Sequence, residues 1–413
     1  MNSITRAAIA VSLLACFAAP AQADMSMEER FKAMESRMDS LERENRALKG
    51  QLQKAEQKVE VAGEQLEKIT VQGTSPKAAW AEKTQFGGYG ELHLNKLNNE
   101  KPGGASKDEL DFHRFVLFMG HQFNDRVRFF SELEVEHALS KDTQSGTAST
   151  GLVGLEQAYL DFTLSDSLSA KAGLLLMPVG IISETHEPPT FYGVERNPVE
   201  TNIIPTTWRE GGASLSARLG NGFAVDGAIT SGLKTTAGKN YAVRDGRQHV
   251  ANAPAKDPAY TARLKWTGIP GVELAGTVHY QSDVTQSADA AAGAARLYET
   301  HAAVNKGQFG LRALYANWSL DGNGPKAVGA NKQNGWYVEP AWKFTEQWGV
   351  FARHSRWDNQ AGDAADSQYR QTDVGVNYWP HPDVVVKLDF QNQKSPTGKD
   401  EYDGYNLGIG YQF

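Results

Sequence analysis

The chain has 413 residues, a formal net charge of −7 and a mean hydropathy of −0.49. This balance excludes a strongly basic nucleic-acid-binding protein and leaves a weak acidic bias. After residue 23 no segment offers the roughly 18–20 consecutive apolar residues that a membrane-spanning helix needs. A membrane β-barrel escapes this test, because only alternate residues of each strand face lipid and its composition resembles that of a soluble protein.

Residues 1–23 are predicted to be a secretory signal peptide. Arg6 precedes an apolar core at residues 7–19, and Ala21-Gln22-Ala23 is a small-residue cleavage site. The segment Leu13-Leu14-Ala15-Cys16 offers an alternative, a lipoprotein box, although leucine fits poorly at its second position. Cleavage after Ala23 would leave a mature chain without cysteine, and therefore without disulfides or thiolate chemistry.

Residues 24–72 show a seven-residue repeat, in which apolar side chains step by four and three positions. Charged and amide side chains fill the flanking positions, as is typical of a coiled coil that packs against other helices. Asn45 is the polar member of the seam, where a buried amide fixes the register at some cost in stability. A solvated helical linker is the alternative, and the pattern does not decide between two strands and three. The oligomerisation seam includes Phe31, Met34, Met38, Leu41, Asn45, Leu48 and Leu52.

A linker is expected at residues 73–84, since Gly73, Ser75 and Pro76 end the helical pattern. From residue 85 to residue 413 the hydrophobic period becomes two, with turn residues at regular intervals. We therefore expect an all-β transmembrane barrel of about sixteen antiparallel strands, preceded by an N-terminal α-helical coiled coil. The expected strands span residues 85–96, 110–123, 126–138, 152–164, 168–180, 209–219, 222–233, 258–268, 272–281, 295–305, 308–320, 335–344, 348–357, 369–379, 384–394 and 404–413.

The expected connections alternate in length. Long ones follow odd-numbered strands and tight turns follow even-numbered strands, as in outer-membrane barrels with one external and one periplasmic rim. A large two-sheet soluble protein would explain the alternating side chains but not this order of loops. Both chain ends, and with them the coiled coil, are then expected on the periplasmic side.

The last strand shows the predicted faces clearly, because Tyr405, Leu407 and Ile409 alternate with polar or small residues. Charged positions must line water, since a lipid-facing Arg or Lys at the midplane costs roughly 2–4 kcal/mol. A polar interior in a barrel of this size predicts a water channel. Aromatic residues near strand ends are expected in the interfacial girdles: Tyr260, Trp266, Trp318, Trp336, Trp348 and Trp379.

The third long connection, residues 181–208, is the longest and contains four prolines. A long stiff loop of this kind is usually functional, and we expect it to fold inward and narrow the channel with its carboxylates. The alternative is an ordinary external loop on the rim. The candidate residues of this constriction loop are Glu184, His186, Glu187, Glu195, Arg196, Glu200 and Arg209.

The predicted barrel wall carries charges of both signs, so no strong ion selectivity is assigned. The candidate pore-lining residues are Arg114, Glu132, Glu134, Lys171, Arg218, Arg263, Lys265, Arg312, Lys343 and Lys387. The fourth long connection is basic and is expected to concentrate anions at the mouth; its cations are Lys234, Lys239, Arg244, Arg247 and Lys256.

Other chemistry finds little support in the sequence. His113, His121 and His137 lie on separate expected strands without a metal-ligand spacing, so we expect no metal site and no cofactor. The acidic run Glu132, Glu134 and Glu136 could bind a divalent cation, although a solvated wall is the simpler interpretation. Phosphate-binding loops and nucleophile elbows are absent from the sequence, and no enzymatic activity is expected.

The stretch from Gly173 to Gly180, the glutamate-rich loop, the run from Arg209 to Gly212 and the C-terminal Gly410-Tyr411-Gln412-Phe413 resemble the phosphate-selective porin O and P family. The signal peptide and heptads agree with this, as they do with related dicarboxylate-type channels. The resemblance implies sixteen-stranded trimeric porins, and it implies that Tyr411 and Phe413 form the signal read by the barrel-assembly machinery. Phosphate selectivity in the family rests on a basic constriction, whereas the corresponding loop here is net acidic.

The expected function is passive diffusion of small hydrophilic solutes, including anions such as phosphate or dicarboxylates, across an outer membrane. The expected partners are outer-membrane lipid, two further copies of the chain in a homotrimer, the solutes and, during biogenesis, the assembly machinery. The alternative is a structural tether, in which the coiled coil reaches the cell wall and the pore is incidental.

Overall fold

The computed structural model describes residues 80–138 and 151–413. The predicted signal peptide, coiled coil and most of the linker lie outside the described residues, as does most of the second long connection. Within the described part, no helix is long and apolar enough to cross a membrane.

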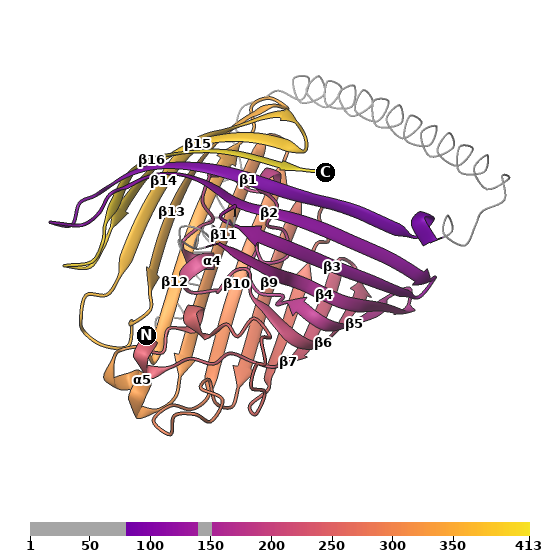
Figure 1. Ribbon diagram of the computed structural model, residues 1–413, viewed down its shortest axis with the longest axis horizontal. Helices are drawn as coiled ribbons and strands as arrows, with labels where there is room; N and C mark the ends of the chain where they lie inside the picture. The colour runs from indigo at the N-terminus through magenta and orange to yellow at the C-terminus, as the bar shows by residue number, and fades with distance from the viewer. Residues whose placement is uncertain (1–79, 139–150) are drawn as a thin grey trace, which may run out of the picture. The chain divides into compact units, whose positions relative to one another are not determined.

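Sixteen antiparallel strands among the described residues form one closed barrel (Figure 1), in which β1 pairs with β2 on one side and with β16 on the other. The strands are β1 (Thr84–Asn99), β2 (Lys107–Asn124), β3 (Val127–Glu136), β4 (Leu152–Ser165), β5 (Leu168–Leu176), β6 (Arg209–Gly220), β7 (Phe223–Thr230), β8 (Ala259–Trp266), β9 (Val272–Gln281), β10 (Ala295–Lys306), β11 (Phe309–Leu320), β12 (Lys332–Trp342), β13 (Trp348–Asp358), β14 (Tyr369–His381), β15 (Val384–Lys394) and β16 (Tyr402–Gln412). Short helical turns lie in the connections: η1 (Pro188–Thr190), α4 (Val199–Asn202), η2 (Ala237–Lys239), η3 (Val243–Gly246) and α5 (Asn323–Ala327).

The predicted strands are confirmed, and so is the alternation of long and short connections. The shortest connections that follow odd strands are 100–106 and 395–401, whereas the longest that follow even strands are 267–271 and 343–347. The largest difference from prediction is at β5, which ends at Leu176 rather than at residue 180. Pro178 lacks a backbone N–H for the ladder, so the stretch after Leu176 joins the third connection.

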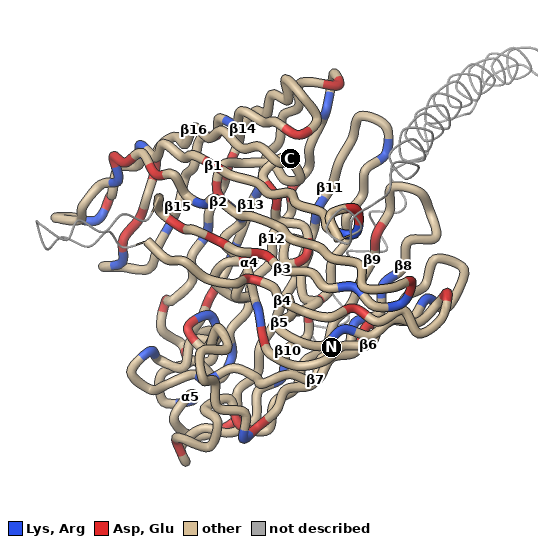
Figure 2. The backbone as a smooth tube through the Cα atoms, turned by 45° about the vertical axis from the view of Figure 1, so that its right-hand side comes forward, with Lys and Arg blue, Asp and Glu red and all other residues tan. Residues whose placement is uncertain are grey.

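Side chains alternate between the outside and the inside of the wall, as expected from the two-residue period. In β16, Tyr405, Leu407 and Ile409 are exposed on the outer face. Asn406, which lies between Tyr405 and Leu407 in the sequence, is buried inside the barrel. In β15, Leu388 and Phe390 face outward and alternate with the buried Lys387 and Asp389. Figure 2 shows charged residues of both signs on the strands as well as on the loops.

The interior is not polar throughout, which corrects the sequence analysis. Several inward positions of β10, β11 and β12 are apolar and form a core with residues of the third and fourth long connections. Trp318 is fully buried in this core, and Trp379 is 7% exposed and donates from Nε1 to the Pro189 carbonyl, 3.3 Å away. The prediction that these two tryptophans belong to the interfacial girdles was therefore wrong, because the two-residue period does not distinguish an inward position that meets water from one that meets a loop.

Candidate functional site: a loop across the lumen and an arginine-lined vestibule

The third connection, residues 177–208, leaves the wall at β5 and reaches strands on the far side of the barrel. Its η1 turn contacts β1, β15 and β16, and its α4 turn contacts β12 and β13. The side chains that hold it alternate with lipid-facing residues on those strands and therefore point inward. This segment lies inside the barrel, as Figure 1 also shows for α4.

The first half of the loop is held through its backbone. Lys387 donates from Nζ to the Gly193 carbonyl at 2.8 Å, and the same nitrogen lies 3.6 Å from the centre of the Phe191 ring. Asp389 accepts the Val194 N–H at 2.6 Å. Arg353 of β13 donates to the carbonyl of Glu195 at 3.4 Å and also pairs with carboxylates of the wall. Wall charges thus dock the loop, and they are not free to attract solutes.

Glu200 organises the second half of the loop and is fully buried. Its Oε1 accepts the N–H groups of Ile181 and Ile182 at 2.6 and 2.7 Å, and its Oε2 accepts the Tyr337 hydroxyl at 2.8 Å. Gly180 has a φ of +81°, and a Cβ at this position would meet Glu200 Oε1 at 2.5 Å. This carboxylate is a structural clamp that requires glycine beside it.

The remaining carboxylates of the loop are also engaged or lie away from its tip. Glu195 Oε1 lies 3.2 Å from His93 Nδ1 and accepts a hydrogen bond from Asn95 at 3.1 Å. Glu184 pairs with Arg263 of β8. Glu187 is half-buried next to η1. The net acidic composition of the loop therefore overstates the negative charge that a permeating ion would meet.

A cavity of about 530 Å³ lies between this segment and the end of the barrel that carries the long connections, which we call the long-loop side. We call this cavity the vestibule. The sequence did not predict it as one site, because its residues come from β1 to β4, the start of β6, the third and fourth connections and the ends of β13 to β15. Five arginines and three glutamates line it: Arg114, Arg196, Arg209, Arg244, Arg247, Glu91, Glu136 and Glu195.

The arginines of the vestibule differ in their partners. Arg114 pairs with Glu91 at 2.7 Å, and Arg209 pairs with Glu156 at 3.3 Å. No carboxylate among the described residues lies in ion-pair range of the other three arginines. Within the described residues, Arg244 and Arg247 donate only to the backbone carbonyls of Thr201 and Thr206, at 3.3 and 3.4 Å. The Nε and Nη2 atoms of Arg196 are buried and have no hydrogen-bond partner in the described part of the chain.

Two groups of the fourth connection register this excess of positive charge through their pKa. Burial and the nearby Arg244 and Arg209 lower the pKa of Arg247 to about 10, so it remains charged at neutral pH. Burial and the same cluster, Arg209 and Arg247, lower the pKa of His249 to about 4. Burial is the larger cause of both shifts, and the arginine cluster adds to it.

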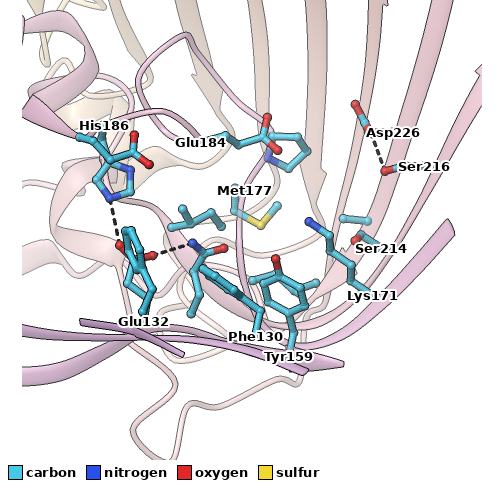
Figure 3. Close-up of a pocket in the computed structure, with 17 residues that line it drawn as sticks. Phe130, Glu132, Tyr159, Lys171, Met177, Glu184, His186, Ser214, Ser216 and Asp226 are labelled. Carbon is cyan, nitrogen blue, oxygen red and sulfur yellow. Dashed lines mark hydrogen bonds and ion pairs between the residues drawn. The ribbon is translucent and has the colours of Figure 1, made fainter. Parts of the chain in front are cut away.

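A second cavity, of about 410 Å³, lies on the short-turn side of the loop (Figure 3). Lys171 projects into it over the Tyr159 ring, 4.7 Å from its centre, and Ser216 donates to Asp226 at 2.6 Å. His186 and Glu132 lie together at its edge. This cavity contains charges of both signs.

The remaining predicted pore-lining residues are dispersed over the wall. Arg263 pairs with Asp226 at 2.7 Å, and Lys265 lies 3.9 Å from Glu273. Arg312 donates to the Thr190 carbonyl at 2.7 Å, so it too holds the loop. Arg218 is exposed at the short-turn rim and Lys343 is exposed above the Trp379 ring.

Four buried interior residues are not among those predicted from the sequence: Glu91, His93, Glu156 and Arg353. The buried Glu134 lies between two arginines, 3.4 Å from Arg114 Nη1 and 3.6 Å from Arg209 Nη1. The two-residue period could have placed Glu91, His93 and Arg353 on the inner face, but not their partners.

The C-terminal residues close the barrel. Phe413 and Gly88 exchange two backbone hydrogen bonds of 2.9 Å each. The Phe413 ring is exposed and stacks near Tyr411, with ring centres 6.5 Å apart. Their role as an assembly signal remains a prediction.

Comparison with known proteins gives a family and a fold. A model of the family described as phosphate-selective porin O and P matches residues 86–413. An uncharacterized protein of Aquifex aeolicus (strain VF5) is 28% identical over 366 residues, 79% of this chain and 79% of that protein. The fold is similar to an anion-selective porin from Comamonas acidovorans, with a TM-score of 0.55, 12% identity and coverage of 80% of this chain and 99% of that one. It is similar to Salmonella typhi OmpF, in a complex with daunomycin, with a TM-score of 0.54, 15% identity and coverage of 80% of this chain and 97% of that one. The chain belongs to the phosphate-selective porin O and P family and is a passive outer-membrane channel.

Proposed function

We propose that this porin prefers small anions over cations and that the vestibule selects them. The observation that supports the proposal is the set of three arginines, Arg196, Arg244 and Arg247, without a carboxylate partner among the described residues. Arginine binds carboxylate and phosphate groups with paired N–H donors, so inorganic phosphate and dicarboxylates are the solutes with matching chemistry.

Planar-bilayer recording tests this proposal. We expect the wild-type channel to show an anion-biased reversal potential in a KCl gradient, and phosphate or succinate to reduce chloride current. The triple variant R196Q/R244Q/R247Q should lower the chloride-to-potassium permeability ratio, roughly tenfold at low ionic strength.

A matched control comes from the same basic loop. Lys234, Lys239 and Lys256 do not line the vestibule, so K234Q/K239Q/K256Q removes equal charge and should leave selectivity nearly unchanged. Equal effects of the two triple variants would mean that diffuse loop charge, rather than the vestibule, sets selectivity. A wild-type channel without anion bias would overturn the proposal and leave a general porin.

The assembly is also part of the proposal: a homotrimer held by the barrels and by the heptads at residues 24–72 in the periplasm. The regular seam and the family membership support it. A structural tether is not favoured, because the family match covers the channel rather than the coiled coil. Removal of residues 24–72 should preserve conductance and weaken trimers on native gels. Trimers of unchanged stability would contradict the role of the heptads.

A further inference from the structure

A buried cluster below the vestibule brings together two carboxylates and one imidazole. Glu132 lies on β3, Glu156 on β4 and His186 on the third connection, and each is at most 3% exposed. His186 Nε2 lies 3.4 Å from Glu132 Oε1 and 3.3 Å from Glu156 Oε2. None of these three atoms has a hydrogen-bond partner within the described residues. Figure 3 shows the His186 ring directed at Glu132.

The backbone is shaped to bring the two carboxylates together. The β3–β4 register pairs Glu132 with Gln157 and Leu133 with Leu155, which leaves Glu156 as the extra residue of a β-bulge. A bulge of this kind redirects a side chain and is common beside functional sites. Without it, Glu156 could not lie on the inner face beside Glu132, because neighbouring residues of a regular strand point to opposite faces.

The other polar atoms of the cluster are each held by a second group. Gln157 donates to Glu132 Oε2 at 2.6 Å. Thr207 and Arg209 contact Glu156 Oε1. His186 Nδ1 lies 3.3 Å from the Ser183 carbonyl, a contact that orients the ring with the Nε2 lone pair toward the carboxylates. Such outer contacts are typical of groups that orient metal ligands.

We propose that Glu132, Glu156 and His186 bind one divalent transition-metal ion, best matched by Zn²⁺, which fastens the start of the loop to the wall. Imidazole nitrogen and carboxylate oxygen are common zinc ligands, and bonds of about 2.0–2.1 Å to a tetrahedral ion set ligand atoms roughly 3.3–3.4 Å apart. A direct charge-assisted hydrogen bond would be shorter, about 2.7–2.9 Å. The 410 Å³ cavity, which Glu132 and His186 line, gives the fourth position access to solvent.

A protonated His186 is the competing state of the cluster. Burial lowers the pKa of His186, but Glu132 and Glu156 outweigh burial and raise it to about 9. An imidazolium would neutralise part of the carboxylate charge and would exclude the metal. The two states predict opposite outcomes for metal binding.

The experiment uses the untagged full-length protein, because a histidine tag would itself bind metal. After removal of metal with a chelator, we expect calorimetry and elemental analysis to show one tightly bound Zn²⁺ per chain, and Co²⁺ to give the visible absorption of a tetrahedral complex. E156Q and H186Q should bind Zn²⁺ roughly 100-fold more weakly or not at all. Heat-modifiable mobility on SDS gels checks that each variant has folded.

Two controls separate this cluster from its surroundings. E184Q alters a carboxylate of the same loop and should bind like wild type. Asp111, His113 and His137 form another group with converging ligand atoms, near the long-loop end of β2 and β3, so D111N/H113Q/H137Q should retain the tight site. The proposal would be overturned if the triple variant lost Zn²⁺ while H186Q retained it. It would also be overturned if the folded wild-type protein bound no stoichiometric Zn²⁺. A chelator should also increase open-channel noise in wild type but not in E156Q.

Discussion

Two sectors of the inner wall have the same alternation of inward and outward side chains but differ in the polarity of the inward ones. On β10 to β12 the inward positions nearest the long connections are mainly apolar, and Leu297, Leu314 and Trp318 belong to a core with the third and fourth connections, although Glu299, His301 and Glu339 on the same strands are buried too. On β1 to β4 many inward positions are charged, and Glu91, Arg114 and neighbouring residues line the vestibule. The apolar sector packs against both loops, whereas the charged sector both contacts the third connection, as His93 does at Glu195, and lines the vestibule. A polar pore in this protein therefore depends on an apolar core inside the barrel.

The substitution with the largest expected effect removes a side chain at the centre of the apolar sector. Trp318→Ala deletes a fully buried indole and its hydrogen bond to the Ile203 carbonyl, which is 2.9 Å long. We expect a loss of about 3–5 kcal/mol in the docking of the loops, from burial and cavity effects. Limited proteolysis should reveal new cleavage within residues 177–208, and conductance should become noisy. Trp348→Ala, on the outer face of β13, should cause neither change; equal cleavage in both variants would refute a specific role for the core.

The next test breaks the clamp that connects the loop to the apolar sector. Glu200→Gln replaces an oxygen that accepts buried donors with an N–H₂ group, so the Ile181 and Ile182 N–H groups or the Tyr337 hydroxyl lose an acceptor. The expected cost is on the order of 3 kcal/mol. Hydrogen exchange at residues 181–182 should speed up at least tenfold. Glu184→Gln serves as the control, since its side chain is partly exposed, and unchanged exchange in Glu200→Gln would show that the clamp is dispensable.

The smallest expected effect concerns the charged sector and is a change of ion selectivity with pH. His249 has a pKa lowered to about 4 by burial and by Arg209 and Arg247, so it is neutral above that pH and gains a positive charge only as the pH falls through it. Wild type and His249→Gln should therefore have the same reversal potential from pH 7 to pH 5. Near pH 3 the wild type should become more anion-selective than the variant, by about twofold. A difference already present at pH 6 would mean that the vestibule is less positive than we infer.

The strands could be predicted because each carries its own signal. In β16 the alternation of Leu407 and Ile409 with small or polar residues needs no partner to be recognised, and tight turns mark the short-turn rim. The site was predicted less well. Glu195 and Glu200 were expected at a constriction, and their burial and hydrogen bonds instead hold the loop. Arg196, one basic residue in an acidic segment, is the loop charge left without a carboxylate partner among the described residues.

The sequence by itself determined the barrel, its strand number and the alternation of faces along strands such as β16, because a period of two and the order of loop lengths are local properties. Only the tertiary structure decided which inward positions meet water, which meet a loop, and which charges remain unpaired. Those outcomes depend on contacts between residues far apart in the chain, such as Glu156 with His186 or Trp318 with Ile203. Charge counted along a segment therefore differs from the charge that a solute meets, since a buried and fully bonded carboxylate contributes to the fold rather than to the pore.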